Sequence, residues 1–157
     1  MNSEADHELF NSASQKWKDG DLESALSIVT SLILKTDRDN ADLAAYYSLR
    51  GGIYQELGVL SAAGADFKQL VMIKPASRLA SAFYYNALIE SDNLTEANLE
   101  GLRFLATIEN RFDLTVDTQS YVDTILSNLF HSEDWSKNLL PKEIEMVTAR
   151  LKAREQV

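Results

Sequence analysis

The sequence predicts an all-α protein, and two features of its patterning indicate this fold class. Apolar residues recur at helical spacing along almost the whole chain of 157 residues, as expected for amphipathic helices that bury one face. The runs of β-branched residues that are typical of strands are missing. We therefore expect about eight helices, over residues 4–18, 22–35, 41–56, 61–73, 77–91, 94–109, 115–131 and 141–155.

The residues between these segments are of the types that end or begin helices. Gly20 and Gly58 can adopt a positive φ between two paired helices, because glycine has no Cβ. Ser61 is predicted to cap the fourth segment by accepting a hydrogen bond from a backbone N–H. Pro75 has no N–H to donate and ends that segment, whereas Pro141 is tolerated in the first turn of the last one. Short connections of this kind are typical of antiparallel helical neighbours.

A short sequence recurs at the turns inside three successive helix pairs. Residues 20–25 read GDLESA, residues 58–63 read GVLSAA and residues 92–97 read DNLTEA. The alanine that ends each of these hexapeptides recurs after 38 and then 34 residues. A period of this length indicates an array of helical pairs, in which each pair buries its apolar face against the next.

The middle unit has the most regular pattern. Its characteristic positions are Tyr47, Gly51, Tyr54, Gly58, Ala63, Phe67, Leu70 and Pro75. At this spacing, residues 44–77 resemble one complete tetratricopeptide repeat. Small residues at Gly51 and Ala63 would let the two helices of the pair approach closely, and the rings of Tyr54 and Phe67 would fill the wedges between helices.

The resemblance to the tetratricopeptide family covers about three repeats over residues 6–109, at approximately 6–39, 44–77 and 78–110. The third copy departs from the pattern at Tyr85, Gly101 and Glu109. The resemblance implies a right-handed superhelical array of antiparallel helix pairs. We expect residues 113–155 to form a capping pair, and the whole chain, 1–157, to be a single domain.

Charge and composition exclude several classes of protein. With 15 Lys plus Arg against 24 Asp plus Glu, the formal net charge is −9, which disfavours nucleic acid and anionic membranes. The absence of cysteine excludes disulfides, thiolate metal sites and a cysteine nucleophile. The first thirty residues lack the basic and apolar regions of a secretion signal, and no stretch is apolar for long enough to span a membrane. We therefore expect a cytoplasmic protein.

The residues that could carry chemistry do not form a recognisable catalytic or metal-binding pattern. His7 and His131 are far apart and lack metal-ligand spacing. The pair Gly51-Gly52 lies inside a predicted helix, without the Lys-Ser/Thr of a phosphate-binding loop. Close packing is the favoured explanation for Gly51, whereas for Gly52 helix packing and ligand approach both remain open. We predict no catalytic residue, no cofactor and no metal site.

The resemblance implies a concave groove formed by the first helix of each pair. The partner-binding positions predicted on this basis are Phe10, Ser14, Trp17, Ala45, Ser48, Gly52, Gln55, Leu79, Ala82, Asn86 and Ile89. Asn11, Lys18, Glu56 and Glu90 occupy further groove positions. Most of these side chains are small, weakly polar or apolar, so the binding affinity should come from apolar contact.

Members of this family are best known for clamping a C-terminal carboxylate with cationic side chains. The matching positions here are Ser48, Gly52, Ala82 and Asn86, with Phe10 and Ser14 or Asn11 and Gln15 in the first repeat, depending on its register. None of them is a cation, so the charge-assisted bonds that hold a carboxylate are missing. Binding of heat-shock chaperone tails is not expected.

Two functional hypotheses follow from the sequence. The first is an adaptor or chaperone that holds a segment of another protein in the groove. Length, acidity and repeat number are similar to the small tetratricopeptide chaperones of type III secretion, although their leading helical arm is missing. The alternative is an acidic inhibitor, such as an immunity protein, that masks a basic effector. The expected partner is a protein or peptide, and the sequence leaves open whether the protein is a homodimer.

Overall fold

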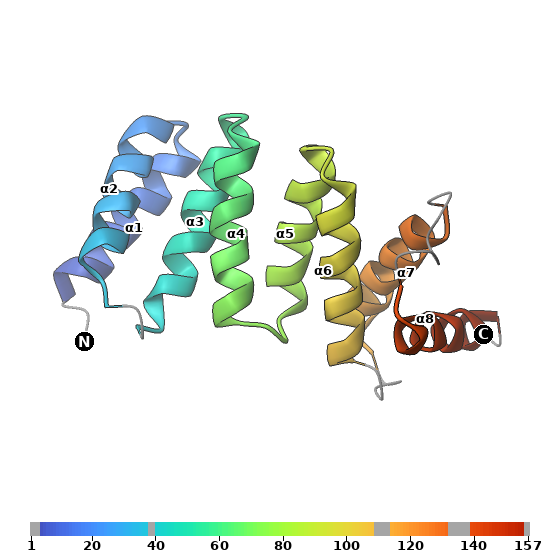
Figure 1. Cartoon of the computed structure of the whole chain (residues 1–157). Helices are drawn as coiled ribbons and strands as arrows, with labels where there is room; N and C mark the ends of the chain where they lie inside the picture. The colour runs from blue at the N-terminus through green and yellow to red at the C-terminus, as the bar shows by residue number, and fades with distance from the viewer. Residues whose placement is uncertain (1–3, 38–39, 109–113, 132–138, 156–157) are drawn as a thin grey trace. The chain divides into compact units, whose positions relative to one another are not determined.

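The computed structural model describes residues 4–37, 40–108, 114–131 and 139–155. Their secondary structure is α-helical throughout (Figure 1). The helices are α1 (Glu4–Lys18), α2 (Leu22–Lys35), α3 (Asp42–Glu56), α4 (Leu60–Ile73), α5 (Arg78–Glu90), α6 (Leu94–Thr107), α7 (Val116–His131) and α8 (Pro141–Glu155).

The predicted helix boundaries agree closely with these bounds. Pro75 follows the end of α4, and Pro141 is the first residue of α8, as expected. The prediction that Ser61 caps α4 is wrong. The N-cap of α4 is Val59, which makes no side-chain capping bond, because the helix already begins at Leu60.

The chain forms two compact units, residues 1–93 and 94–157. Unit 1 contains α1 to α5 and therefore two complete helix pairs of the predicted repeat and the first helix of the third. Within it α1 packs on α2, α2 on α3, α3 on α4 and α4 on α5, as the blue to green ribbons show (Figure 1). The prediction of a single domain stays a prediction.

The core of unit 1 is continuous between its first and second helix pairs. Two small residues, Ala13 of α1 and Ala25 of α2, are fully buried. They pack in one cluster with larger side chains of α2 and α3, including Val29, Leu32 and Ile53. The helical spacing of apolar residues in the sequence therefore corresponds to faces that are buried between helices.

Three turns end the first helices in the same way. Gly20, Gly58 and Asp92 all have a positive φ, of 83°, 74° and 58°. In each turn the N–H of the next residue bonds to a carbonyl five positions earlier, as in the bond from Val59 to Tyr54. This is the Schellman motif, which favours glycine because a Cβ is strained at positive φ. The recurring hexapeptides thus mark a recurring backbone structure.

A buried ion pair joins α3 to α4. The guanidinium of Arg50 donates two hydrogen bonds to the carboxylate of Asp66, at 2.8 and 2.7 Å, and Asp66 is only 3% exposed. The hydrogen bonds to Asp66 raise the pKa of Arg50 above its ordinary value. The same guanidinium lies 5.8 Å from the ring centres of Tyr47 and Tyr54, which favours the cation further.

Unit 2 contains α6, α7 and α8. Phe104 of α6 packs against Tyr121 of α7, with ring centroids 5.1 Å apart. Arg150 of α8 donates a hydrogen bond to the carbonyl of Ile108. The prediction that residues 113–155, here α7 and α8, form a capping pair stays a prediction, and so does the alternative that they continue the array as a fourth repeat. Glu109 and the segment 132–138, which contains Trp135, lie outside the described residues.

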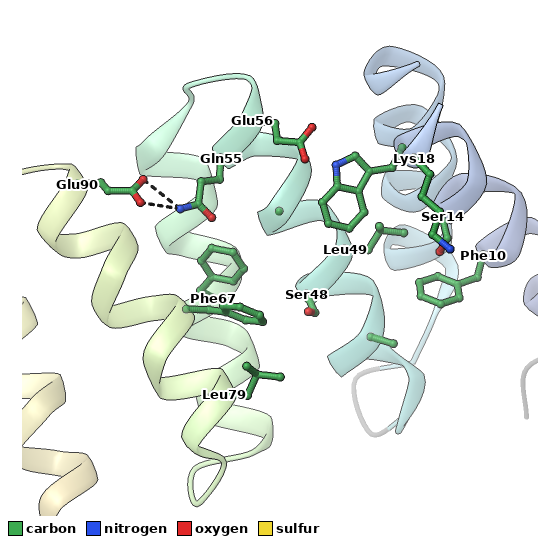
Figure 2. A pocket seen from close by; sticks show the side chains of 14 residues that line it. Phe10, Ser14, Lys18, Ser48, Leu49, Gln55, Glu56, Phe67, Leu79 and Glu90 are labelled. Atoms are coloured by element: carbon green, nitrogen blue, oxygen red, sulfur yellow. Dashed lines mark hydrogen bonds between the residues drawn. The ribbon is translucent and has the colours of Figure 1, made fainter. Parts of the chain in front are cut away.

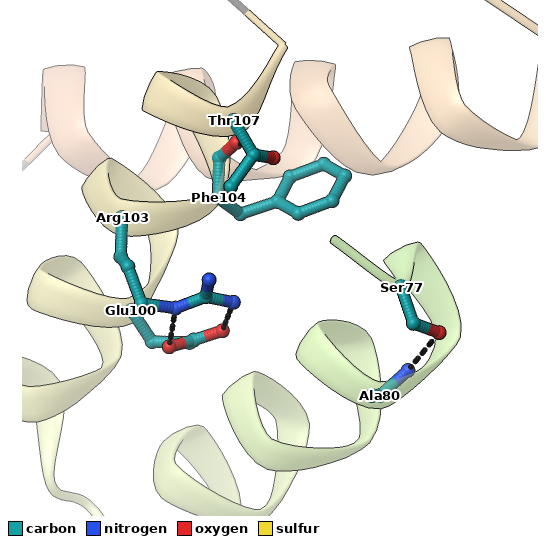
Figure 3. A network of polar contacts seen from close by, with 6 residues as sticks. All are labelled: Ser77, Ala80, Glu100, Arg103, Phe104 and Thr107. Carbon is teal, nitrogen blue, oxygen red and sulfur yellow. Dashed lines mark hydrogen bonds and ion pairs between the residues drawn. The ribbon is translucent and has the colours of Figure 1, made fainter. Parts of the chain in front are cut away.

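A second bidentate ion pair lies on α6. Glu100, 5% exposed, accepts hydrogen bonds from Arg103 at 2.7 and 2.6 Å (Figure 3). The bonds to Glu100 raise the pKa of Arg103. The same figure shows the cap of α5, where Oγ of Ser77 accepts a hydrogen bond from the N–H of Ala80 at 3.2 Å.

The Arg50–Asp66 pair predicts a non-additive pair of substitutions. Arg50→Met should lower the free energy of unfolding by about 3 kcal/mol, because it leaves the Asp66 carboxylate buried without a counter-charge. The double variant Arg50→Met/Asp66→Leu should recover to within about 1 kcal/mol of the wild type, since no unpaired charge remains. Urea denaturation followed by circular dichroism measures both, and strictly additive losses would contradict this account.

The two helical glycines Gly51 and Gly64 should respond oppositely to alanine. A Cβ on Gly51 would lie 2.6 Å from Cε1 of Phe67, whereas a Cβ on Gly64 would meet nothing within 4 Å. Overpacking should make Gly51→Ala less stable by about 1 to 2 kcal/mol. Gly64→Ala should be more stable by about 0.5 to 1 kcal/mol through helix propensity. Equal effects in thermal unfolding would disprove the close contact at Gly51.

Candidate functional site

A cavity of about 790 Å³ opens within unit 1. We call it the unit 1 cavity. It is lined by Phe10, Ser14, Trp17, Lys18, Ala45, Ser48, Leu49, Gly52, Gln55, Glu56, Phe67, Leu79, Phe83 and Glu90. All but Phe67 of α4 come from the first helices of the pairs, α1, α3 and α5 (Figure 2).

Helical periodicity explains why these residues share one surface. On α1 the lining positions Phe10, Ser14, Trp17 and Lys18 are spaced at intervals of four, three and one, so they fall on one face of the helix. Ala13 is fully buried in the core and lies on the adjoining face of α1, about 60° around the helix from Phe10. The packing face and the cavity face of α1 therefore adjoin, and Phe10 and Trp17 also pack against the core.

The structure brings eight of the eleven predicted groove residues together in this cavity. They are Phe10, Ser14, Trp17, Ala45, Ser48, Gly52, Gln55 and Leu79. The other three, Ala82, Asn86 and Ile89, lie on α5 but do not line the cavity. Which of the eleven bind a partner stays a prediction.

Three lining residues were not among the predicted positions, namely Leu49, Phe67 and Phe83. Phe67 reaches the cavity from a second helix, and its ring lies 5.3 Å from that of Phe83 between centroids. The resemblance to the tetratricopeptide repeat placed the Phe67 ring in a wedge between helices. This aromatic position was the sequence signal from which its place in the cavity wall could have been predicted. The two rings together form an aromatic part of the cavity wall.

The glycine pair on α3 determines how closely the cavity walls approach. Gly51 faces the Phe67 ring, which confirms the packing interpretation for this residue. A Cβ on Gly52 would lie 2.9 Å from Cη2 of Trp17, so Gly52 lets the indole lie directly on the α3 backbone. Gly52 also lines the cavity. Helix packing and access to the cavity therefore both apply at Gly52.

The side chain of Trp17 contains a buried polar atom, the indole nitrogen. Its indole Nε1 is buried and has no hydrogen-bond acceptor among the residues that the structure describes. A buried donor without an acceptor is unfavourable by about 1 to 3 kcal/mol. The contact of the ring with Gly52 offsets this cost by burying a large apolar surface.

Polar groups gather at one end of the cavity. Nε2 of Gln55 donates hydrogen bonds to both carboxylate oxygens of Glu90, at 2.9 and 3.0 Å, and so links α3 to α5. Glu56 and Lys18 also lie at the cavity, with Lys18 on the α1 side (Figure 2). None of these three charged residues forms an ion pair within the described parts of unit 1.

The described residues contain no group of three or more His, Asp or Glu side chains that could hold a metal ion. Within the same ranges, no helix combines the length and the apolar character needed to cross a membrane. A smaller hollow of about 140 Å³ lies beside His7 and Asp42. His7 Nε2 is 3.8 Å from the Asp42 carboxylate there.

Comparison with known proteins identifies the fold. No protein-family model matches the sequence, and no curated protein matches it. Solved structures do match. One is the first tetratricopeptide (TPR) domain of Spaghetti (RPAP3), solved with the HSP90 peptide SRMEEVD bound. The similarity has a TM-score of 0.61 at 18% sequence identity and covers 83% of this chain and 97% of that one. The chain therefore has the tetratricopeptide-like, all-α fold that the sequence predicts.

Two substitutions at Trp17 separate the role of the ring from that of its unpaired donor. Trp17→Phe removes the unpaired donor, which is stabilising, and leaves a smaller ring against Gly52, which is destabilising. Because the two effects oppose each other, the free energy of unfolding should change by less than about 1 kcal/mol. Trp17→Ala removes the ring and should cost about 2 kcal/mol. Urea denaturation followed by circular dichroism measures both values. A Phe variant as unstable as the Ala variant would show that the indole N–H has a partner.

Proposed function

We propose that the unit 1 cavity binds a segment of another protein and that the chain acts as an adaptor or chaperone. The observation that carries this proposal is the convergence of one face each of α1, α3 and α5 on a single cavity. Its volume of about 790 Å³ lies within the range of ligand sites. Its lining of aromatic, small and a few polar side chains suits a peptide that inserts apolar side chains.

The peptide bound by the RPAP3 domain is acidic, and we propose a different ligand for this chain. The positions that would clamp a carboxylate, Ser48, Gly52, Ala82 and Asn86, are uncharged. The only cation lining the cavity, Lys18, is accompanied by the carboxylates of Glu56 and Glu90. An acidic tail would be repelled by these two carboxylates. It would also lack the charge-assisted hydrogen bonds that stabilise a buried carboxylate.

A binding module accounts for this site better than an enzyme does. The cavity lining contains no histidine, neither of its serines is hydrogen-bonded to Lys18 or to a carboxylate in the described residues, and one of its two carboxylates, Glu90, is held by Gln55. Such a lining lacks the paired nucleophile and base that catalysis requires. We propose a protein-binding role on these grounds, and a cytoplasmic location because a chain without cysteine suits a reducing compartment.

The alternative, an acidic inhibitor of the immunity type, rests on the net charge of −9. It would bind through Asp and Glu residues scattered outside the cavity, and its affinity would fall steeply with salt. The two functions therefore differ in whether a substitution inside the cavity abolishes binding.

The test is a selection of displayed random 12-residue peptides on the wild-type protein, followed by fluorescence anisotropy with the enriched peptides. Ser48→Arg places a long cationic side chain in the cavity and should weaken binding at least about ten-fold, equivalent to 1.4 kcal/mol. The matched control Ala65→Arg lies on the exposed surface of α4, away from the cavity lining. It should bind as the wild type does.

Both variants are first checked for wild-type helicity by circular dichroism. Enriched peptides that bind Ser48→Arg as tightly as the wild type would rule out the cavity as their site. Binding of a basic protein that is lost at high salt but kept in Ser48→Arg would favour the inhibitor instead.

A further inference from the structure

The unit 1 cavity has a charge distribution that a general peptide-binding role leaves unexplained. Glu56 and Glu90 are the last residues of α3 and α5, where the helix dipole presents its negative end. Carboxylates are unfavourable at that position, and cations are usual there. Neither helix has a basic residue in its last turn. In contrast, the last turn of α1 contains Lys16 and Lys18.

The two carboxylates lie at the same end of the cavity. Gln55, next to Glu56 on α3, reaches across to α5 and holds both oxygens of Glu90. Figure 2 shows Glu56 and Glu90 on either side of Gln55, whereas Ser48 and Leu79 lie further along the cavity. Two helix C-termini and two carboxylates therefore combine into one region of negative potential.

This negative charge is not neutralised by the protein's own side chains. The partner of Glu90 is a neutral amide, and Glu56 has no ion-pair partner in the parts of the chain that the structure describes. Lys18 is the only cation of the lining and lies on the α1 side. A low-dielectric wall that includes Phe67 and Phe83 strengthens the field at the cavity mouth.

We infer that the unit 1 cavity takes a protein segment in which an apolar side chain is followed closely by a Lys or Arg. The apolar side chain seats among Trp17, Phe67 and Phe83, and the cation meets Glu56 and Glu90. This inference rests on the proposed function, because it specifies the ligand of the same cavity. It also gives the segment a direction, since its cationic part lies towards α3 and α5 and away from Lys18.

A side-chain cation fits this region better than a metal ion does. A divalent ion requires six or more oxygen ligands or several converging carboxylates, and the described residues form no such group. A guanidinium or ammonium on a flexible stem needs only one or two carboxylates at hydrogen-bond distance. Its aliphatic stem can also pack along the apolar surface of the cavity lining.

The test uses an array of 12-residue peptides with a fixed tryptophan and leucine anchor, in which each other position is in turn Arg, Gln or Glu. Binding is measured by anisotropy to the wild type and to three variants, namely Ser48→Arg, Glu56→Gln/Glu90→Gln and Glu8→Gln/Glu23→Gln. The last variant removes the same two charges from exposed positions of α1 and α2 outside the cavity lining.

At one or two positions near the anchor, Arg should bind the wild type about five-fold more tightly than Gln, and Gln more tightly than Glu. This preference should fall below about two-fold in Glu56→Gln/Glu90→Gln and persist in Glu8→Gln/Glu23→Gln. Equal loss in both double variants would indicate a general net-charge effect and overturn the inference.

The array also separates this inference from the proposed function. If Ser48→Arg abolishes peptide binding but the wild type prefers no charge at any position, the inference fails and the cavity remains the binding site. If binding is the same in Ser48→Arg as in the wild type, the proposed function itself fails. The double variants are compared only after circular dichroism shows the wild-type fold.

Discussion

The close approach of α3 to the helices on either side of it is the constraint on which unit 1 depends. Gly51 and Gly52 are neighbours on α3, so their α-carbons face directions about 100° apart. One meets the ring of Phe67 from α4, and the other meets the ring of Trp17 from α1. Neither ring could lie where it does if α3 carried a Cβ at these positions. The two glycines therefore set the distance of α3 from α4 within the second helix pair and from α1 of the first pair.

The cavity is a consequence of this packing. Trp17 and Phe67 both line it, and their positions follow from the glycines beneath them. Arg50, adjacent to Gly51, makes the bidentate ion pair with Asp66 that fixes α4 against α3. One short stretch of α3 thus supplies the helix contacts, a buried ion pair and part of the cavity wall.

The positions of two acidic residues are more informative about the site than the net charge of the whole chain. The net charge of −9 would favour solubility and attract basic partners wherever the acids lay. Two of the acids end α3 and α5 at the cavity, where Gln55 orients one of them. Charge and apolar surface therefore meet in a single site. The partner segment that we propose would be selected there by both properties together.

The sequence by itself determined the helices, their turns and most of the cavity residues. Helical periodicity places Phe10, Ser14 and Trp17 on one face, and positive φ at Gly20 and Gly58 follows from glycine chemistry, because these are local properties of the chain. The tertiary structure decided that Trp17 lies on Gly52, that Phe67 reaches the cavity from a second helix, that Asp66 pairs with Arg50, and that Gln55 holds Glu90. These contacts join residues 16 or more positions apart, and no periodicity within one helix specifies which side chains meet across two helices.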